Sequence, residues 1–113
     1  MYQKLGLVEP WSNSSDLGRY QVTKQENDKL VFKVPSLRNI EKTAPYFHDG
    51  SVATLEQAVK LMGEHQLGKK LQDNEIQSIV TWLKSLTGAI PSDYIKPPNL
   101  PQSTAQTPRP EST

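Results

Sequence analysis

Two stretches of the chain carry apolar residues at helical spacing. The first begins at Thr54 and Gln57, which form a capping box in which each side chain satisfies the other's free backbone amide. The apolar face that follows consists of Leu55, Ala58, Val59 and Met62, with Leu61 beside it. Gly63 and Gly68 predict that this helix weakens after Met62 and has ended by Leu67.

A second helix is predicted from about residue 74 to residue 87. Asp73 suits the N-cap, because its carboxylate can accept from the free amides of the first turn. The apolar residues that recur at helical spacing are Ile76, Ile79, Val80, Leu83 and Leu86. Gly88 is predicted to supply a left-handed stop, and Pro91 prevents the helix from resuming. Two amphipathic helices of this kind need a third apolar partner.

The first fifty residues lack a sustained period. Residues 16–22 could form a short helix and residues 23–29 another turn. Residues 30–34 have strand propensity, but Pro35 ends the run and we find no second strand to pair with it. We therefore interpret residues 30–50 as an ordered, irregular loop that wraps around something, and we expect an all-α fold with long irregular loops.

The end of the chain is rich in proline. Residues 91–113 hold six of the nine prolines and few sizeable apolar groups. Proline lacks the backbone donor and fixes φ, so we predict a disordered tail that favours polyproline II. The chain is thus divided into one small domain, residues 1–90, and this tail.

Composition narrows the function classes. Of 113 residues, 13 are basic and 12 acidic, and a net charge of +1 gives no electrostatic case for binding nucleic acid or an acidic membrane surface. No apolar run is long enough to span a bilayer, and residues 1–4 do not resemble a signal peptide. The absence of cysteine excludes disulfides, thiolate metal sites, thiol catalysis and a CxxCH haem attachment within this chain.

Few residues suggest chemistry when each is taken alone. His48 stands beside an Asp-Gly turn and is more simply explained as a hydrogen-bonded loop histidine than as a catalyst. His65 follows the apolar face and is interpreted as solvated, while Met62 is interpreted as core filler. The residue pattern therefore gives helices and a wrapping loop, without a catalytic constellation.

However, several motifs, and the order in which they occur, resemble those of the bacterial di-haem cytochrome c peroxidases. The motifs are residues 31–40 (VFKVPSLRNI), residues 43–51 (TAPYFHDGS) and residues 54–59 (TLEQAV). The likeness continues through Asp73, residues 79–80 and residues 83–88, and residues 1–11 are similar to the segment just after the family's second haem-attachment motif. It covers roughly residues 1–90.

In that family two c-type haem domains stand side by side, and the enzyme reduces hydrogen peroxide to water. The resemblance implies that this chain is the C-terminal, electron-transfer domain, a cytochrome c-like domain without its first haem-attachment helix. Its CxxCH motif would then lie shortly before Met1. The implied cofactors are haem c and calcium. The implied partners are the CxxCH-bearing portion, a cytochrome c or cupredoxin donor and a second copy, and the implied location is the periplasm.

The resemblance changes the interpretation of Met62. In the family, a methionine on the helix after the FHDG turn is the distal axial ligand of the electron-transfer haem, and Met62 matches it. A thioether is a soft ligand that raises the potential of haem iron. The face through Leu55, Val59 and Met62 would then contact a porphyrin. A related oxygenase branch has tyrosine at this position, so Met62 favours the peroxidase branch.

The resemblance also implies places in the functional site for five more residues. Thr43 and Pro45 match the positions whose backbone carbonyls bind calcium in the family. Arg38 and Lys33 could pair with haem propionates, or could simply be surface residues. His48 would lie close to the haem, and we assign it no chemical role.

The departures from the family limit the function. The peroxidatic haem, the active-site acid and both CxxCH motifs are missing from the chain, so we expect it to be inactive and poorly folded alone. It is interpreted as a truncated or misassigned reading frame, or as one piece of a split gene with an upstream partner chain. The alternative is a haem-free helical protein-interaction module that kept the scaffold.

Overall fold

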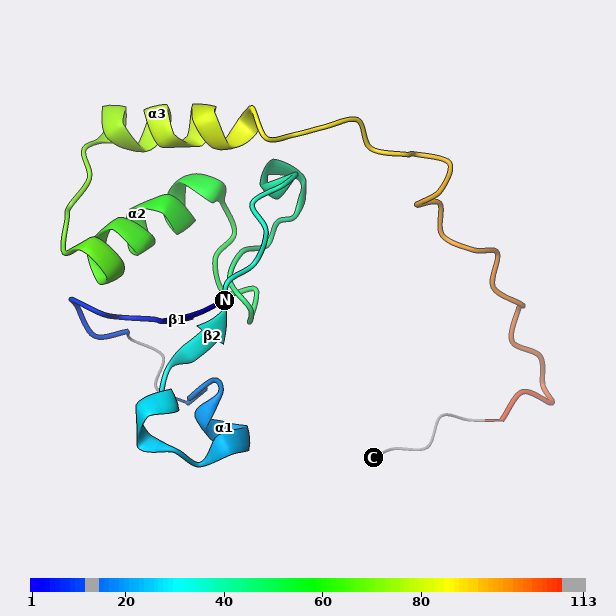
Figure 1. The fold of residues 1–113 in the computed structure, drawn as a ribbon. Coiled ribbons are helices and arrows are strands. Elements are labelled where there is room, and N and C mark those ends of the chain that lie inside the picture. The colour runs from blue at the N-terminus through cyan, green and yellow to red at the C-terminus, as the bar shows by residue number, and fades with distance from the viewer. Residues whose placement is uncertain (12–14, 109–113) are drawn as a thin grey trace.

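The computed structural model describes residues 1–11 and 15–108. In chain order its elements are β1 (Tyr2–Lys4), α1 (Tyr20–Thr23), η1 (Glu26–Asp28), β2 (Val31–Lys33), η2 (Ile40–Lys42), α2 (Leu55–Leu67) and α3 (Asp73–Lys84). The helices α2 and α3 lie together, the two short strands lie beside α2, and the segment after α3 leads away from both helices (Figure 1). The end of the predicted tail, residues 109–113, lies outside the described residues.

Helix α2 begins as the sequence predicts. Thr54 is the N-cap, and its Oγ1 accepts a 3.3 Å hydrogen bond from the amide of Gln57. The helix ends at Leu67, where Gly68 adopts the left-handed region with φ of 63° and its amide donates to the carbonyl of Glu64. The predicted weakening after Met62 is wrong, because the helix continues through Gly63 to Leu67.

Helix α3 is correctly predicted, but its N-cap and its last residue differ from the prediction. The N-cap is Gln72 instead of Asp73, and it forms a capping box with Glu75, whose Oε2 accepts from the Gln72 amide at 2.8 Å. The helix ends at Lys84, three residues earlier than predicted. Gly88 is not among the described glycines with positive φ, so the predicted left-handed stop is wrong.

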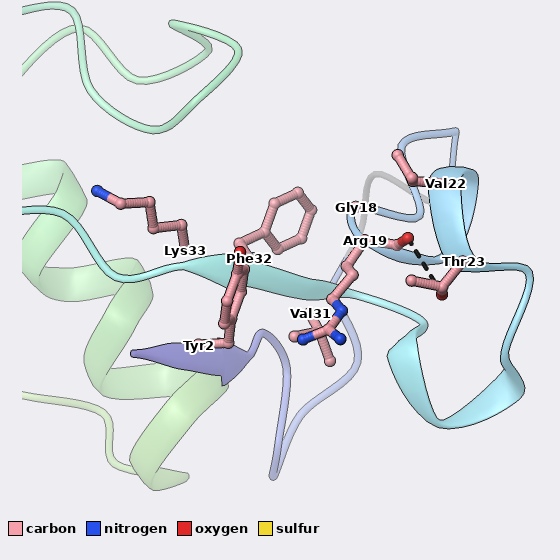
Figure 2. Close-up of a pocket in the computed structure, with 8 residues that line it drawn as sticks. All are labelled: Tyr2, Gly18, Arg19, Val22, Thr23, Val31, Phe32 and Lys33. Carbon is pink, nitrogen blue, oxygen red and sulfur yellow. Dashed lines mark hydrogen bonds between the residues drawn. The ribbon is translucent and has the colours of Figure 1, made fainter.

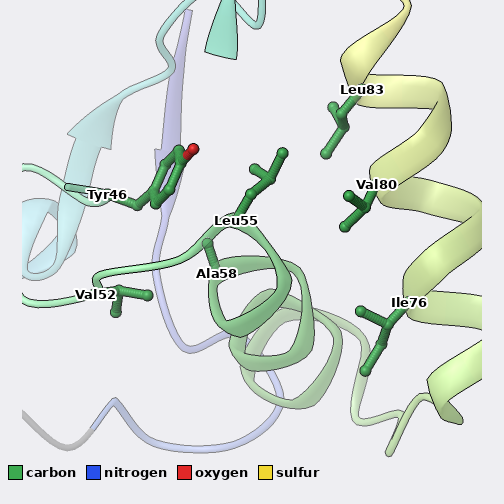
Figure 3. Close-up of a cluster of buried hydrophobic side chains, with 7 residues drawn as sticks. All are labelled: Tyr46, Val52, Leu55, Ala58, Ile76, Val80 and Leu83. Carbon is green, nitrogen blue, oxygen red and sulfur yellow. The ribbon is translucent and has the colours of Figure 1, made fainter. Parts of the chain in front are cut away.

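The hydrophobic core lies between α2 and α3 and is closed by the loop that precedes α2 (Figure 3). Its buried members are Tyr46, Val52, Leu55, Ala58, Ile76, Val80 and Leu83. Val80 is the most deeply buried of them, at 1% exposure. Tyr46 and Val52 exchange backbone hydrogen bonds of 2.7 and 3.4 Å, which holds the loop over the start of α2. Ile79, which the helical spacing groups with the buried residues of α3, is 37% exposed.

The expectation of an all-α fold is only partly met, because β1 and β2 form a two-stranded antiparallel sheet. In its register, Tyr2 pairs with Lys33 and Lys4 with Val31. The pairing is extended by two backbone hydrogen bonds. The Leu5 amide donates to the Leu30 carbonyl at 2.8 Å, and the Val34 amide donates to the Met1 carbonyl at 3.2 Å. Residues 2–4 show no apolar alternation, so this partner strand was not predicted, and all three residues are exposed in the structure.

The short helix predicted within residues 16–22 is the single turn α1, and the next turn is η1. Asp28 joins them, since it accepts a 2.7 Å hydrogen bond from the Thr23 hydroxyl and pairs with Arg19 at 3.2 Å. Among the described residues, no helix is both long and apolar enough to cross a membrane.

Candidate functional site

Met62 lies on the face of α2 that also forms the core. It follows Leu55 by seven residues and Ala58 by four, so a helix of ~3.6 residues per turn places all three on one side. Leu55 and Ala58 are buried, whereas Met62 is only half-buried. Among the described residues, Met62 belongs neither to the buried cluster nor to the side chains packed against it. The apolar face of α2 therefore extends beyond the core, and Met62 stands on that extension.

An aromatic cluster adjoins this part of α2. Trp11 makes edge-on contacts with Phe47 and His65, at centroid distances of 5.1 and 4.9 Å. His65 follows Met62 by three residues, and its Nδ1 lies 3.1 Å from the carbonyl oxygen of Glu9. The interpretation of His65 as a solvated residue is therefore wrong. Its ring helps to hold the N-terminal segment against α2.

Backbone hydrogen bonds strengthen the same attachment. The amides of Val8 and Glu9 both donate to the carbonyl of His65, at 3.1 and 3.3 Å. The Gln66 side chain accepts from the Leu7 amide and donates to the carbonyl of Lys4. The segment before Trp11 thus follows the C-terminal half of α2, a placement that the sequence pattern did not predict.

His48 is tied to another part of the chain. Its Nε2 lies 2.7 Å from Oδ2 of Asp16, and its ring stacks on Phe32 at a centroid distance of 4.5 Å. The preceding residue, Phe47, has a φ of 65°, and Gly50 closes the turn with a φ of 66°. Both imidazole contacts fit the interpretation of His48 as a hydrogen-bonded loop histidine.

Arg38 and Lys33 are both exposed, and neither makes an ion pair with any other described residue. Lys33 ends β2 and lines an open groove of about 490 Å³ between the strands and α1 (Figure 2). The other residues of the groove are Tyr2, Gly18, Arg19, Val22, Thr23, Val31 and Phe32. Met62 is not among them, so the groove and the methionine are separate features.

Thr43 and Pro45 are exposed in the loop between η2 and Tyr46. The Thr43 hydroxyl donates to the carbonyl of Ile40 at 3.1 Å, and the bond between Ala44 and Pro45 is cis. Within the described residues, no group of three or more His, Cys, Asp or Glu side chains could hold a metal ion. The calcium prediction rests on backbone carbonyls, which that result does not test.

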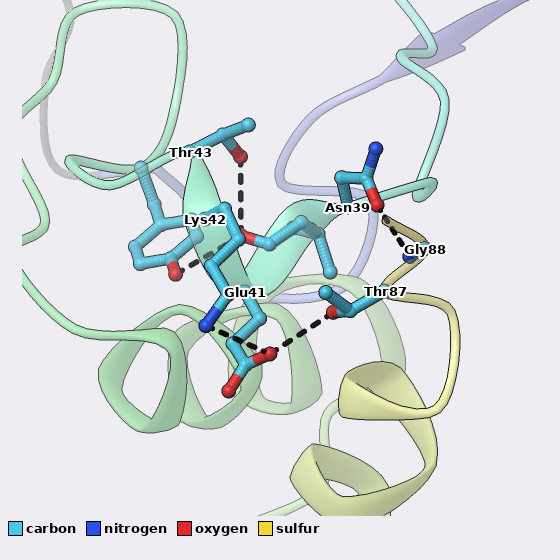
Figure 4. A network of polar contacts seen from close by, with 8 residues as sticks. Asn39, Glu41, Lys42, Thr43, Thr87 and Gly88 are labelled. Carbon is cyan, nitrogen blue, oxygen red and sulfur yellow. Dashed lines mark hydrogen bonds and ion pairs between the residues drawn. The ribbon is translucent and has the colours of Figure 1, made fainter. Parts of the chain in front are cut away.

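A polar network fastens η2 and its N-cap, Asn39, to the residues that follow α3 (Figure 4). Oδ1 of Asn39 accepts a 2.7 Å hydrogen bond from the amide of Gly88, and the amide of Asn39 donates to the carbonyl of Leu86. The hydroxyl of Thr87 donates to Oε2 of Glu41 at 3.0 Å, and that bond lowers the pKa of the Glu41 carboxyl below its usual value. Thus the side chains of Asn39 and Glu41 fix the segment that directly follows α3.

Two groups between η2 and α2 also have shifted pKa values. Burial raises the pKa of the Tyr46 phenol, and the nearby carboxylates of Glu56 and Glu41 raise it further. The phenol donates a 3.1 Å hydrogen bond to the carbonyl of Ile40. The Ser51 hydroxyl and amide lower the pKa of Asp49. These bonds organise the turn around His48.

The described donors fit one axial position of a haem but not its covalent attachment. Met62 offers a soft thioether at the edge of an apolar helix face. Nε2 of His48 already contacts Asp16, and His65 stands three residues after Met62 on the same helix, so its ring lies on the same side of any porphyrin as the thioether. The chain has no cysteine to form thioether bonds. We conclude that a haem on Met62 would need its attachment and second ligand from another segment.

No protein-family model matches the chain. Among curated proteins, the cytochrome c551 peroxidase of Nitrosomonas europaea is 51% identical over 109 residues, which are 96% of this chain and 32% of the relative. The cytochrome c551 peroxidase of Pseudomonas aeruginosa is 48% identical over 97 residues, 86% of this chain and 28% of the relative. The cytochrome c peroxidase Ccp of Escherichia coli is 48% identical over 77% of this chain and 20% of the relative.

One solved structure is also similar to this chain. The crystal structure of a MauG-like protein associated with microbial copper homeostasis matches with a TM-score of 0.64 and 31% identity, over 78% of this chain and 35% of that one. The predicted resemblance is confirmed, because the chain is homologous to cytochrome c peroxidases over most of its length. It spans about a third or less of each of these proteins.

Proposed function

We propose that this chain is part of a di-haem cytochrome c peroxidase and supplies the methionine side of the electron-transfer haem pocket. The whole enzyme would reduce hydrogen peroxide to water, a reaction in which each peroxide takes up two electrons and two protons. The electrons would come from a cytochrome c or a cupredoxin in the periplasm. The chain alone would be inactive, since it holds neither a haem attachment site nor the peroxidatic centre.

The position of Met62 carries this proposal. An ordinary core methionine would pack among Leu55, Ala58 and the residues of α3, but Met62 lies on the same helix face beyond them. When a c-type haem is bound there, its iron would supply one-electron chemistry, and the thioether would favour the reduced state. The Trp11 contacts with Phe47 and His65 would hold that part of α2 in place.

The other predicted site residues are all exposed, and we propose roles that an exposed residue can fill. Arg38 and Lys33, which lack ion pairs in the described residues, would pair with the haem propionates. The carbonyl groups of Thr43 and Pro45 would bind a calcium ion together with ligands from the rest of the enzyme. His48 would stabilise the turn beside the haem through Asp16.

The test uses the chain co-expressed with the complementary portion of the Nitrosomonas europaea relative and with the cytochrome c maturation machinery. The variant Met62→Leu keeps the apolar volume and removes only the sulfur, so folding should be preserved. We expect it to abolish the thioether-to-iron charge-transfer band and to lower the reduction potential of one haem. Leu61→Ala, on a neighbouring residue that packs against the core, serves as the control and should keep the band.

An unchanged band and potential in Met62→Leu would contradict the ligand assignment. A stable helical chain that never combines with haem or with the complementary portion would favour the alternative, a haem-free interaction module. Circular dichroism of the purified chain, recorded beside the absorption spectrum, distinguishes these results.

A further inference from the structure

A second possible iron ligand follows Met62 on the same helix. His65 comes three residues later in α2, and this spacing places the two side chains on the same side of the helix. Both residues are half-buried. Imidazole is a common ligand of haem iron and competes best for the ferric state, whereas a thioether favours the ferrous state. Helix α2 therefore presents two different donors to one side of a haem that is bound at Met62.

The structure holds the imidazole of His65 in contacts of its own. Its Nδ1 lies 3.1 Å from the carbonyl oxygen of Glu9. A carbonyl oxygen can only accept, so Nδ1 carries the proton and Nε2 of the neutral ring keeps the lone pair that could bind iron. Nε2 makes no hydrogen bond with any of the described residues. The nitrogen that could compete with Met62 is therefore available unless the ring is held away from the metal.

Trp11 restrains the same ring. Its indole meets the imidazole edge-on at a centroid distance of 4.9 Å, with an interplanar angle of 73°. Trp11 is itself fixed by an edge-on contact with Phe47 at 5.1 Å, in the turn before α2. The contacts of His65 with Glu9 and Trp11 are here called the His65 clamp. The clamp ties the imidazole to the N-terminal segment and prevents it from turning freely about its side-chain bonds.

The N-terminal segment does not need this imidazole for its attachment to α2. The amides of Val8 and Glu9 donate to the backbone carbonyl of residue 65 at 3.1 and 3.3 Å. The side chain of Gln66 adds two hydrogen bonds to the same segment. Any residue at position 65 could accept the backbone bonds. The ring contacts therefore have a separate consequence, which is to decide where the imidazole lies.

We infer that Trp11 is a positioning residue that holds His65 away from the haem iron, so that Met62 remains the axial ligand. The inference rests on the proposed function. Removal of the indole would leave the imidazole with only its hydrogen bond to Glu9, and His65 would then compete with Met62 for the ferric iron. The raised reduction potential that a thioether gives would thus depend on the contacts of Trp11.

The test uses Trp11→Ala in the haem-loaded complex with the complementary portion of the Nitrosomonas europaea relative. We expect the thioether-to-iron charge-transfer band of the ferric protein to fall at least tenfold, and electron paramagnetic resonance to show low-spin iron with two nitrogen ligands. The reduction potential of that haem should fall by at least about 59 mV, the one-electron equivalent of a tenfold change in relative affinity. Trp11→Phe keeps a ring edge, and as the matched control it should retain the band.

A double variant separates positioning from general support of the fold. Trp11→Ala combined with His65→Gln lacks the competing imidazole, so its band and potential should return to those of His65→Gln alone. If Trp11 only stabilised α2, the double variant would stay as impaired as Trp11→Ala, which would overturn the inference. A retained band in Trp11→Ala would also overturn it. If Trp11→Ala does not assemble, Trp11→Leu keeps more apolar volume and is compared in the same way.

Met62→Leu distinguishes this inference from the ligand proposal. With Trp11 intact, the His65 clamp should keep the imidazole away from the iron, so Met62→Leu should contain high-spin haem. Low-spin iron with two nitrogen ligands in Met62→Leu would overturn the inference and leave Met62 assigned as the ligand. An unchanged charge-transfer band in Met62→Leu would instead overturn the ligand proposal, and the inference with it.

Discussion

The backbone amide of Gly88 donates a 2.7 Å hydrogen bond to the side-chain oxygen of Asn39, which precedes it by 49 residues. Asn39 has a φ of 59°, and its own amide donates to the carbonyl of Leu86 at 3.2 Å. Asn39, whose backbone is in the left-handed region, therefore satisfies the amide of Gly88 after the end of α3. The sequence had instead suggested that Gly88 itself would adopt the left-handed conformation and end the helix.

Asn39→Ala should destabilise the chain by about 2 kcal/mol. About 1 kcal/mol comes from the lost hydrogen bond and about 1 kcal/mol from placing alanine in the left-handed region. Asn39→Gly tolerates that φ and should lose only the first part. Urea denaturation followed by far-ultraviolet circular dichroism measures both, and equal losses in the two variants would contradict the assigned backbone contribution.

Glu41 should make the stability of the chain depend on acid pH. The Thr87 hydroxyl lowers the pKa of Glu41 in the folded state, so its contribution is present above the usual glutamate pKa and is lost as pH falls through the lowered value. Glu41→Gln and Thr87→Val should each be less stable than the unmodified chain at neutral pH and should approach it in acid. Urea midpoints measured across that range test this, and a constant difference at every pH would contradict it.

Gly63→Ala should destabilise α2 even though alanine is the better helix former. The propensity gain is about 1 kcal/mol, but the new Cβ would lie 2.7 Å from Cδ1 and 2.8 Å from Cγ of Leu71. Overpacking of this kind costs about 1–3 kcal/mol, so we expect a net loss of about 1 kcal/mol. In a Leu71→Ala background the same change should become stabilising, and thermal denaturation of the four proteins would show whether the sign reverses.

His48→Ala should loosen the region around Asp16 with little effect on global stability. The pair between His48 and Asp16 is well exposed, so its loss should cost less than about 1 kcal/mol. Hydrogen exchange at the Leu30 amide, which donates to the carbonyl of Leu17, should become faster. His48→Phe keeps the ring beside Phe32, and slow exchange in this variant would assign the effect to the aromatic stack instead of the hydrogen bond with Asp16.

The two long helices were predictable because their signals are local. The Thr54 cap and Gly68 stand within one turn of the ends of α2, and the buried residues of α3 recur at a period set by the helix. The family resemblance was also available, since it depends on ordered motifs such as residues 43–51. The choice of Gln72 as N-cap was missed because Asp73 offered an equally plausible local signal.

The remaining features were decided by contacts between distant residues. The pairing of Tyr2 with Lys33 and the bond from Gly88 to Asn39 join segments whose own patterns do not name a partner. The sequence alone determined where the helices form and which chemistry the chain lacks, because backbone propensity, capping and composition act over a few residues. Only the tertiary structure decided that Met62 lies beyond the core and Trp82 outside it, because burial depends on which surfaces the folded chain brings together.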